Sequence, residues 1–385
     1  MRESLNTVMV KVMKNSQLKS VSELHSNRAH NFGAGPAMLP TDVMLQAQAE
    51  LADWNGTGMS IMEISHRSDA FIAIAEQTEA DLRELLDIPE NYKVLFLHGG
   101  ATSQFAMVPL NLLRGKNTAD YLYTGMWSEK AIKEAKRYCS VNIALSIESS
   151  GFTSIPDSDS WLLNSESAYV YYTDNETVHG VEFQSVPETG DVPLVTDMTS
   201  NLLSKPIDVS RFGVIFAGAQ KNLGPSGLVV VIVRDDLIGH APKNVPSMYD
   251  YAVHVQEHSM FNTPPTFAWY ITGLVLQWTK RQGGVPEMER RAIRRSEKLY
   301  QFIDNSGLYR NPVAVECRSR MNVPFTLVDE SLNPAFVKEA ELRGLTALAG
   351  HRAVGGMRAS IYNAMPVEGV DELIEFMTDF EKHHG

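Results

Sequence analysis

The sequence predicts an α/β protein with a mostly parallel sheet. Short apolar runs alternate with helical patterns along most of the chain, which is typical of strands joined by crossover helices. The run 227–233 is dominated by β-branched residues, which is typical of a strand buried on both faces. The chain has 385 residues, enough for two or three domains. Its 44% hydrophobic and 21% charged residues exclude the disordered, collagenous and coiled-coil classes.

The expected elements of the first 285 residues follow one another in order. A helix over 40–51 has Thr41 and Asp42 near its start. A second helix, 71–86, repeats apolar residues such as Phe71, Ile74 and Leu82 on one face. Short apolar runs predict strands at 92–97, 119–124, 168–172, 192–196, 212–217 and 227–233. Helical patterns predict further helices at 105–113, 127–138 and 267–279.

The last hundred residues change character and predict a smaller α+β domain. The expected elements are a helix at 285–303, a strand at 322–327, a helix at 333–343, a strand at 358–361 and a helix at 367–383. We therefore expect a large domain over 41–285 and a small C-terminal domain over 286–385. We expect 28–40 to pack with the small domain, and 1–27 to form a poorly ordered extension.

Charge and cysteine content narrow the classes of function. The net charge of -12 argues against a nucleic-acid-binding protein, but local arginines could still bind an anionic substrate. The only two cysteines, Cys139 and Cys317, lack CxxC spacing, so we expect no metal site and reduced thiols in a cytoplasmic protein. No apolar run approaches the roughly 18 residues of a membrane helix. The N-terminus also lacks the apolar segment of a secretory signal.

Three features lie where predicted strands end, the edge at which open α/β sheets bind ligands. The small residues 99–103 join a strand to a helix and suit a phosphate, although a plain turn would look similar. Asp197 follows strand 192–196 and is either a functional carboxylate or a helix N-cap. Lys221 lies in a loop of small residues between two apolar strands, and is either a functional amine or a surface lysine.

A lysine, a carboxylate and a phosphate dock together match the needs of pyridoxal 5′-phosphate. Lys221 would bind the cofactor covalently through its amine and would later move the proton of the substrate Cα. Asp197 would keep the cofactor ring nitrogen protonated, which makes the ring an electron sink. The three features are therefore interpreted as one site.

Seven separated blocks of this sequence resemble the phosphoserine aminotransferases, a family of class V, fold-type I pyridoxal-phosphate transferases. The blocks are NFGAGPAMLP at 31–40, MEISHR at 62–67, HGGATSQF at 98–105, NET at 175–177, GAQKNLGP at 218–225, MFNTPPT at 260–266 and GHRAVGGMRAS at 350–360. The resemblance covers about 31–385. It implies a large domain with a mostly parallel sheet of the seven-stranded type between helices, and a smaller C-terminal α+β domain.

The resemblance also implies how each cofactor-binding residue acts. Lys221 would bind the cofactor, Asp197 would pair with its ring nitrogen, and Trp127 would stack on its ring face. By itself, Trp127 could equally be a core residue. The ring hydroxyl would meet Thr177 and Gln220. The residues expected at the cofactor phosphate are Ala101, Thr102, Asn262 and Thr263. In the family, the last two come from the partner subunit, so the resemblance implies a homodimer with a shared active site.

On the substrate side, the resemblance implies a cluster of cations for two anionic groups. Arg358 would bind the α-carboxylate, because guanidinium groups bind carboxylates as a fork. The distal phosphate or carboxylate would be bound by His66, Arg67, His351 and Arg352. The implied reaction moves the amino group of L-glutamate to 3-phosphohydroxypyruvate for serine synthesis. Bacterial relatives also act on 3-hydroxy-2-oxo-4-phosphooxybutanoate for vitamin B6 synthesis, and we expect that activity here too.

Two positions depart from the pattern of many family members. Ala34 stands where many bacterial members have serine, and Thr102 where some have arginine. Either change could alter substrate affinity without affecting the chemistry. The alternatives are another class V pyridoxal-phosphate enzyme, such as a cysteine desulfurase or an alanine–glyoxylate transaminase, or a non-catalytic α/β module that binds a phosphate ligand. A desulfurase would need a reactive cysteine on a mobile loop, which neither cysteine provides.

Overall fold

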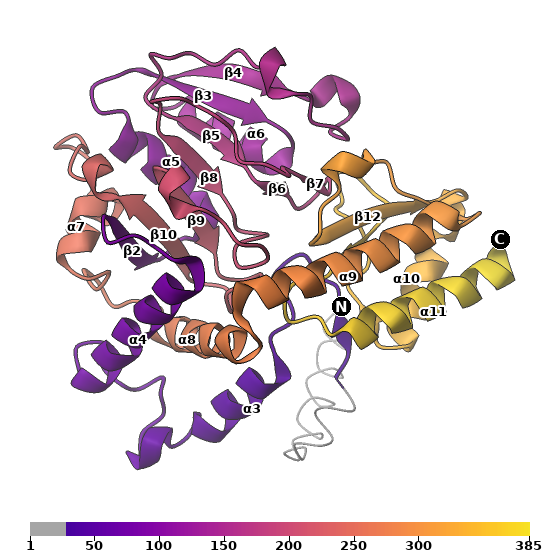
Figure 1. Cartoon of the computed structure of the whole chain (residues 1–385). Coiled ribbons are helices and arrows are strands. Elements are labelled where there is room, and N and C mark those ends of the chain that lie inside the picture. The colour runs from indigo at the N-terminus through magenta and orange to yellow at the C-terminus, as the bar shows by residue number, and fades with distance from the viewer. Residues whose placement is uncertain (1–27) are drawn as a thin grey trace, which may run out of the picture.

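The computed structural model describes residues 28–385, shown in Figure 1. The expected extension at 1–27 lies outside the described residues. The helices of the larger part are α3 (Thr41–Glu50), α4 (Asp69–Leu86), α5 (Gly100–Leu112), α6 (Met126–Ala135), α7 (Tyr251–Gln256) and α8 (Thr266–Arg281). Its strands are β2 (Tyr92–Leu97), β3 (Thr118–Tyr123), β4 (Ser140–Ser146), β5 (Val170–Thr173), β6 (Asn175–Glu176), β7 (Val181–Glu182), β8 (Leu194–Asp197), β9 (Val214–Gly218) and β10 (Val229–Arg234).

The central sheet has seven strands in the order β2-β10-β9-β8-β5-β3-β4. Every neighbouring pair is parallel except the two that involve β10, which runs antiparallel to both β2 and β9. This confirms the mostly parallel α/β sheet. The apolar run of β10 thus reflects burial on both faces and not a parallel neighbour.

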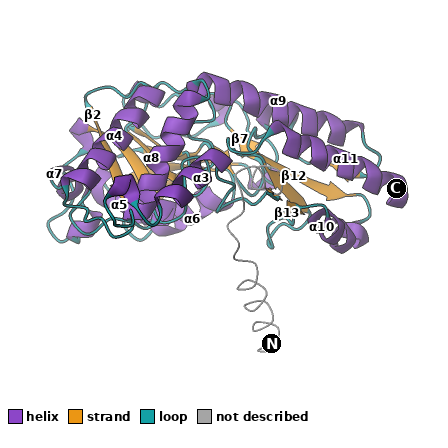
Figure 2. Ribbon diagram, turned by 90° about the horizontal axis from the view of Figure 1, so that it is seen from below, coloured by secondary structure: helices purple, strands orange, loops and turns teal. Residues whose placement is uncertain are grey.

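Helices cover both faces of this sheet, which places its core on two sides (Figure 2). Residues that alternate along β2 belong to different clusters. Val94 and Phe96 pack with residues of α4 and α8, whereas Leu95 and Leu97 pack with residues of α5, α6 and α7. Because side chains of a strand alternate between faces, a strand buried on both sides must be apolar throughout.

The C-terminal part contains a separate three-stranded sheet with helices against it. Its helices are α9 (Gly284–Asn305), α10 (Asn333–Leu342) and α11 (Val367–His384), and α9 runs beside α11 (Figures 1 and 2). The sheet has the order β11-β12-β14, formed by Tyr309–Arg310, Asn322–Leu327 and Met357–Ser360. A short parallel pair joins β1 (His30–Asn31) to β13 (Leu345–Thr346).

The second hydrophobic cluster joins this C-terminal part to residues near the start of the described chain. Phe32 and Met38 pack in the same cluster as Phe325, Phe336 and Phe376. The boundaries drawn at residues 41 and 286 stay predictions, since the helix α9 contributes residues to both cores.

One expected helix starts elsewhere in the structure, and one strand was not expected. The helix expected at 105–113 begins five residues earlier, at Gly100, because residues 100–104 complete its first turn. The strand β4 was not expected, since its sequence, SVNIALS, alternates polar and apolar residues at the sheet edge with several side chains only partly buried. Strands β2 and β12 coincide with the expected 92–97 and 322–327.

Candidate active site

The parallel strands bring widely separated segments to one edge of the sheet. Strands β2, β3, β5, β8 and β9 run in the same direction, so their carboxyl ends meet there. Only β10 presents its amino end. A cavity of about 420 Å³ opens at this edge. Its lining comes from 99–102 after β2, from Trp127 after β3, from 173–177 after β5, from 197–200 after β8, and from 220–227 between β9 and β10.

Lys221 lies on the floor of this cavity and not on the surface. It is only 7% exposed, and its Nζ donates a hydrogen bond to Thr177 Oγ1 at 2.5 Å. Burial lowers the pKa of Lys221 to about 7; Arg358 acts in the same direction, while Asp197 and Glu176 oppose it. An amine near neutrality is a usable nucleophile and base at physiological pH.

Asp197 lies in the same cavity, at the end of β8. Its Oδ1 accepts a hydrogen bond from the backbone N–H of Thr199 at 2.8 Å. The N-cap interpretation is wrong, because turns and no helix follow Asp197; the bond closes a turn, and the carboxylate lines the cavity that holds Lys221. Burial raises the pKa of Asp197, against the opposing effects of its Thr199 hydrogen bonds and of the Lys221 charge. A buried carboxylate of this kind is stabilised by a cation.

Trp127 forms the wall of the cavity above Lys221. The Nζ of Lys221 lies 5.7 Å from the centroid of the Trp127 ring, and that of Lys130 lies 4.2 Å from it. The Trp127 Nε1 atom is buried and finds no hydrogen-bond partner within residues 28–385. A flat ligand could therefore stack on the indole.

The start of α5 provides the place for an anion. The helix begins with Gly99 at its N-cap position and no side-chain cap, so its first N–H groups are available. Gly99 has φ +85°, and a Cβ there would lie 2.6 Å from Ser103 Cβ, so the turn requires glycine. Ala101 and Thr102 lie in the first turn of α5 and line the cavity. Gln220, in the loop after β9, also lines the cavity.

Part of the expected cationic cluster lies close to this cavity. Arg358, in the middle of β14, is 8% exposed, and its Nε is buried without a partner in the described part of the chain. Burial lowers the pKa of Arg358. His351 is near it, since burial and then the charges of Arg358, Arg352 and Lys130 lower the pKa of His351. Arg352 itself is exposed.

Four other expected residues lie outside the cavity. His66 and Arg67 line a separate groove of about 700 Å³ together with Met260 and Trp269. Asn262 and Thr263 lie beside His98: the His98 Nε2 atom is 3.1 Å from Asn262 Nδ2 and 3.1 Å from the Thr263 carbonyl oxygen. Within one chain, the structure thus brings Arg358 close to a set of residues that we call the floor: Lys221, Asp197, Thr177 and Trp127. It leaves His66, Arg67, Asn262 and Thr263 outside the cavity.

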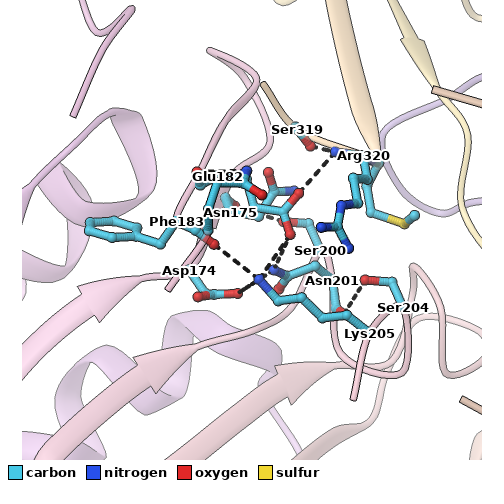
Figure 3. Close-up of polar contacts among 12 residues, drawn as sticks. Asp174, Asn175, Glu182, Phe183, Ser200, Asn201, Ser204, Lys205, Ser319 and Arg320 are labelled. Carbon is cyan, nitrogen blue, oxygen red and sulfur yellow. Dashed lines mark hydrogen bonds and ion pairs between the residues drawn. The ribbon is translucent and has the colours of Figure 1, made fainter. Parts of the chain in front are cut away.

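A buried polar network supports the cavity from behind (Figure 3). Its centre is Lys205, whose Nζ lies 3.1 Å from Asp174 Oδ2 and 3.1 Å from Glu182 Oε1. Burial alone would raise the pKa of Glu182, but Lys205 and hydrogen bonds from Arg320 and Asn201 outweigh it and leave that pKa lowered. The paired charges explain how two carboxylates are tolerated in the interior.

The same network reaches the small sheet. Asn175 donates through Nδ2 to Ser200 Oγ at 2.8 Å and to Asn322 Oδ1 at 2.9 Å. Asn322, on β12, donates in turn to Ser360 Oγ at 2.9 Å, two residues from Arg358. Since Asn175 and Ser200 line the cavity, the network ties the cavity floor to the strand that carries Arg358.

Sequence reasoning missed several residues that line or support the cavity. They are Thr173, Asn175, Glu176, Thr199, Ser200, Ser226 and Lys130. Asn175 and Glu176 belong to the NET block, from which only Thr177 was assigned a role. The signal in the sequence was the polar run at 173–177, which directly follows the predicted strand at 168–172.

The donors present fit pyridoxal 5′-phosphate. One cavity combines a buried amine of lowered pKa, a buried carboxylate, an indole ring and a helix start without a side-chain cap. Among residues 28–385, no cluster of His, Cys, Asp or Glu could hold a metal ion. Over the same residues, no helix is long and apolar enough to cross a membrane.

Comparison with known proteins gives a consistent family. The model of the aminotransferase class-V family matches residues 29–373. A phosphoserine aminotransferase of Pseudomonas putida is 58% identical over 94% of this chain and 100% of its own, and one of Hahella chejuensis is 58% identical over 92% and 98%.

Solved structures agree with these sequence relatives. The phosphoserine aminotransferase of Bacillus circulans subsp. alkalophilus superposes with a TM-score of 0.91 at 46% identity, over 93% of this chain and 99% of its own. A pyridoxal-phosphate-bound phosphoserine aminotransferase of Trichomonas vaginalis gives a TM-score of 0.88 at 40% identity, over 91% and 100%. This chain therefore belongs to the class-V aminotransferases and, within them, to the phosphoserine aminotransferase family.

Proposed function

We propose that this chain uses pyridoxal 5′-phosphate to move the amino group of L-glutamate to 3-phosphohydroxypyruvate, giving O-phospho-L-serine and 2-oxoglutarate. One observation carries the proposal: Lys221 is a buried amine of pKa about 7 in the same cavity as Asp197 and the uncapped start of α5. The names of the family relatives supply the substrates.

The residues of the floor would divide the work among them. When bound, the cofactor supplies an electron sink for charge that develops at the substrate Cα. Lys221 would take the proton from Cα and return it on the cofactor side, which a partly neutral amine can do. Asp197 would stabilise the protonated ring nitrogen, Trp127 would cover one ring face, and Thr177 would orient the Lys221 amine at 2.5 Å.

The outer part of the cavity would select the substrates. The Nε of Arg358 is buried and has no partner among residues 28–385, which suits a carboxylate that arrives with the substrate. His351 and Arg352 follow on the adjacent loop and would bind the distal phosphate or the side-chain carboxylate. Glutamate and the phosphorylated keto acid share the pattern of two anionic ends, so one set of cations can serve both half-reactions. Activity on the four-carbon substrate of vitamin B6 synthesis stays a prediction.

We also propose that the enzyme works as a homodimer in which a second copy supplies Asn262 and Thr263 to the cofactor phosphate, and His66 and Arg67 to the substrate. All four lie outside the cavity of their own chain. Large apolar side chains are exposed beside them, including Met59, Met62 and Phe261, as expected of a subunit interface. A cytoplasmic location is proposed because both cysteines are unpaired.

The visible absorbance of the purified protein tests the reaction. We expect a yellow protein whose band falls when L-glutamate is added and returns when 3-phosphohydroxypyruvate follows. A band that ignores glutamate would leave the cofactor in place and assign a different amino donor. A protein that stays colourless after incubation with pyridoxal 5′-phosphate would refute the proposed function.

A further inference from the structure

Glu176 is a buried carboxylate that the proposed reaction does not use. It is fully buried and belongs to the short strand β6, directly before Thr177. Its two oxygens accept three hydrogen bonds from the start of α6. Oε2 accepts from the backbone N–H of Trp127 at 3.0 Å, and Oε1 accepts from the backbone N–H and the hydroxyl of Ser128 at 2.9 and 2.7 Å.

The hydroxyl of Ser128 accepts a hydrogen bond from the backbone N–H of Gly125 at 2.9 Å, but α6 supplies no N-cap side chain for its own first N–H groups. Its N-cap residue is Gly125, which has no side chain to bond the first N–H groups. A carboxylate is the best substitute, because it bonds those donors and also complements the positive end of the helix dipole. The fit is tight: a Cβ on Gly125 would lie 2.6 Å from Glu176 Cδ and 2.7 Å from His179 Nδ1. The cap and the helix start therefore hold each other in one position.

This contact places Glu176 next to both working parts of the floor. The residue that it caps, Trp127, has its indole ring 5.7 Å from Lys221 Nζ. The next residue in the chain, Thr177, receives the hydrogen bond from that same Nζ. One dipeptide thus sets the position of the stacking ring on one side and of the amine on the other.

We propose that Glu176 is a positioning residue, which fixes the Trp127 ring over Lys221 by capping α6 from the neighbouring strand end. The inference rests on the proposed roles of Lys221 and Trp127 in binding pyridoxal 5′-phosphate. It assigns no contact between Glu176 and the cofactor. The proposed route to the cofactor is through Trp127, and the double-mutant cycle below separates it from the direct effect of the Glu176 charge on the pKa of Lys221.

A double-mutant cycle on the cofactor-free protein tests this route. The affinity for pyridoxal 5′-phosphate is measured by absorbance titration for wild type, Glu176→Gln, Trp127→Ala and the double variant. Glutamine turns an NH₂ group toward one of the backbone donors, so we expect binding about tenfold weaker when tryptophan is present, as for loss of one charge-assisted hydrogen bond. With alanine at 127, the same change should weaken binding less than about twofold, because coupled residues are not additive.

A second readout separates positioning from general stability. The visible circular dichroism of the Lys221-linked cofactor should change in Glu176→Gln in the same sense as in Trp127→Ala. A matched control is Asp250→Ala, which removes the cap of α7 at Ala252 N and should lower the melting temperature without a change in cofactor affinity. If Glu176→Gln does not fold, Glu176→Asp keeps the charge but shortens the side chain by one methylene, which weakens its hold on Trp127 N and Ser128 N, and should give an effect of the same kind.

Equal weakening in both backgrounds would overturn the inference, since Glu176 would then act without Trp127. Unchanged affinity in Glu176→Gln would overturn it as well. Failure of the proposed function looks different: wild type itself would then form no visible band with pyridoxal 5′-phosphate, or the Lys221→Ala variant would form the same band.

Discussion

The floor of the cavity and its outer residues differ in how much of their geometry one chain determines. The floor consists of Lys221, Asp197, Thr177 and Trp127. They follow strand ends of a single sheet and are fixed by hydrogen bonds at 2.5 to 3.0 Å. The outer residues, His66, Arg67, Asn262 and Thr263, lie in surface segments away from that cavity. One chain thus brings the proposed catalytic residues together, whereas the proposed role of the outer residues requires a second copy of the chain.

Removal of the floor amine should have the largest effect. In Lys221→Ala we expect amino transfer to fall by at least about 10³-fold, because both the covalent attachment and the proton transfer are lost. The Lys221-linked visible band should disappear as well. The matched control is Lys298→Ala, which breaks an exposed ion pair with Asp371 and should leave the rate unchanged. A variant at 221 with full activity would place the chemistry elsewhere.

Neutralising the floor carboxylate should have the next largest effect. Asp197→Asn keeps the shape and the Thr199 contact but removes the charge, so kcat should fall by about 10²- to 10³-fold, as when one preorganised electrostatic group is lost. The KM for glutamate should change little, since Asp197 does not face the substrate cations. A rise in KM with kcat unchanged would contradict this assignment.

The outer residues can be tested by mixing subunits. Arg67→Ala and Lys221→Ala should each be nearly inactive alone. If the sites are shared, refolding them together should recover about a quarter of wild-type activity, from one intact site in each mixed dimer. The control mixes the Asp197→Asn variant with the Lys221→Ala variant. Each change damages the floor of its own chain, so a mixed dimer has no intact site and no activity should be recovered. No recovery in the first mixture would place Arg67 in the site of its own chain.

The pH dependence of cofactor attachment should show the smallest change, about tenfold per pH unit at most. Burial lowers the pKa of Lys221 to about 7, and only the neutral amine attacks an aldehyde. The rate at which the cofactor-free protein binds pyridoxal 5′-phosphate should therefore rise with pH through about 7 and level off above it. Stopped-flow absorbance measures this rate. A rise that continues toward the ordinary lysine pKa would show that the floor does not depress it.

The sequence was most informative where local pattern and burial agree. The apolar runs at β2, β9 and β10 are buried on both faces, so their composition alone marks them as strands. Asp197 was found because it directly follows an apolar run, and Lys221 because it lies in a loop of small residues between two such runs. Strand β4 was missed because several of its side chains are only partly buried, which allows polar residues that weaken the signal.

Other features depend on contacts between distant segments and leave no local trace. Glu176 accepts a hydrogen bond from Trp127, 49 residues earlier in the chain, and Asn175 bonds Asn322, 147 residues away. Neither separation follows a helix or strand period, so the hydrophobicity pattern of the sequence does not predict these two contacts. The antiparallel direction of β10 is likewise a property of pairing, since an apolar run has the same sequence in either direction.

That single reversed strand has a practical consequence for engineering. Because β10 begins at the cavity, it ends at the opposite edge of the sheet, near the exposed turn at Gly239 and His240. Gly239 has no atom within 4 Å of where a Cβ would lie. An affinity tag, a fluorophore or a whole inserted domain placed in this turn would therefore report on the enzyme from the side away from its substrates.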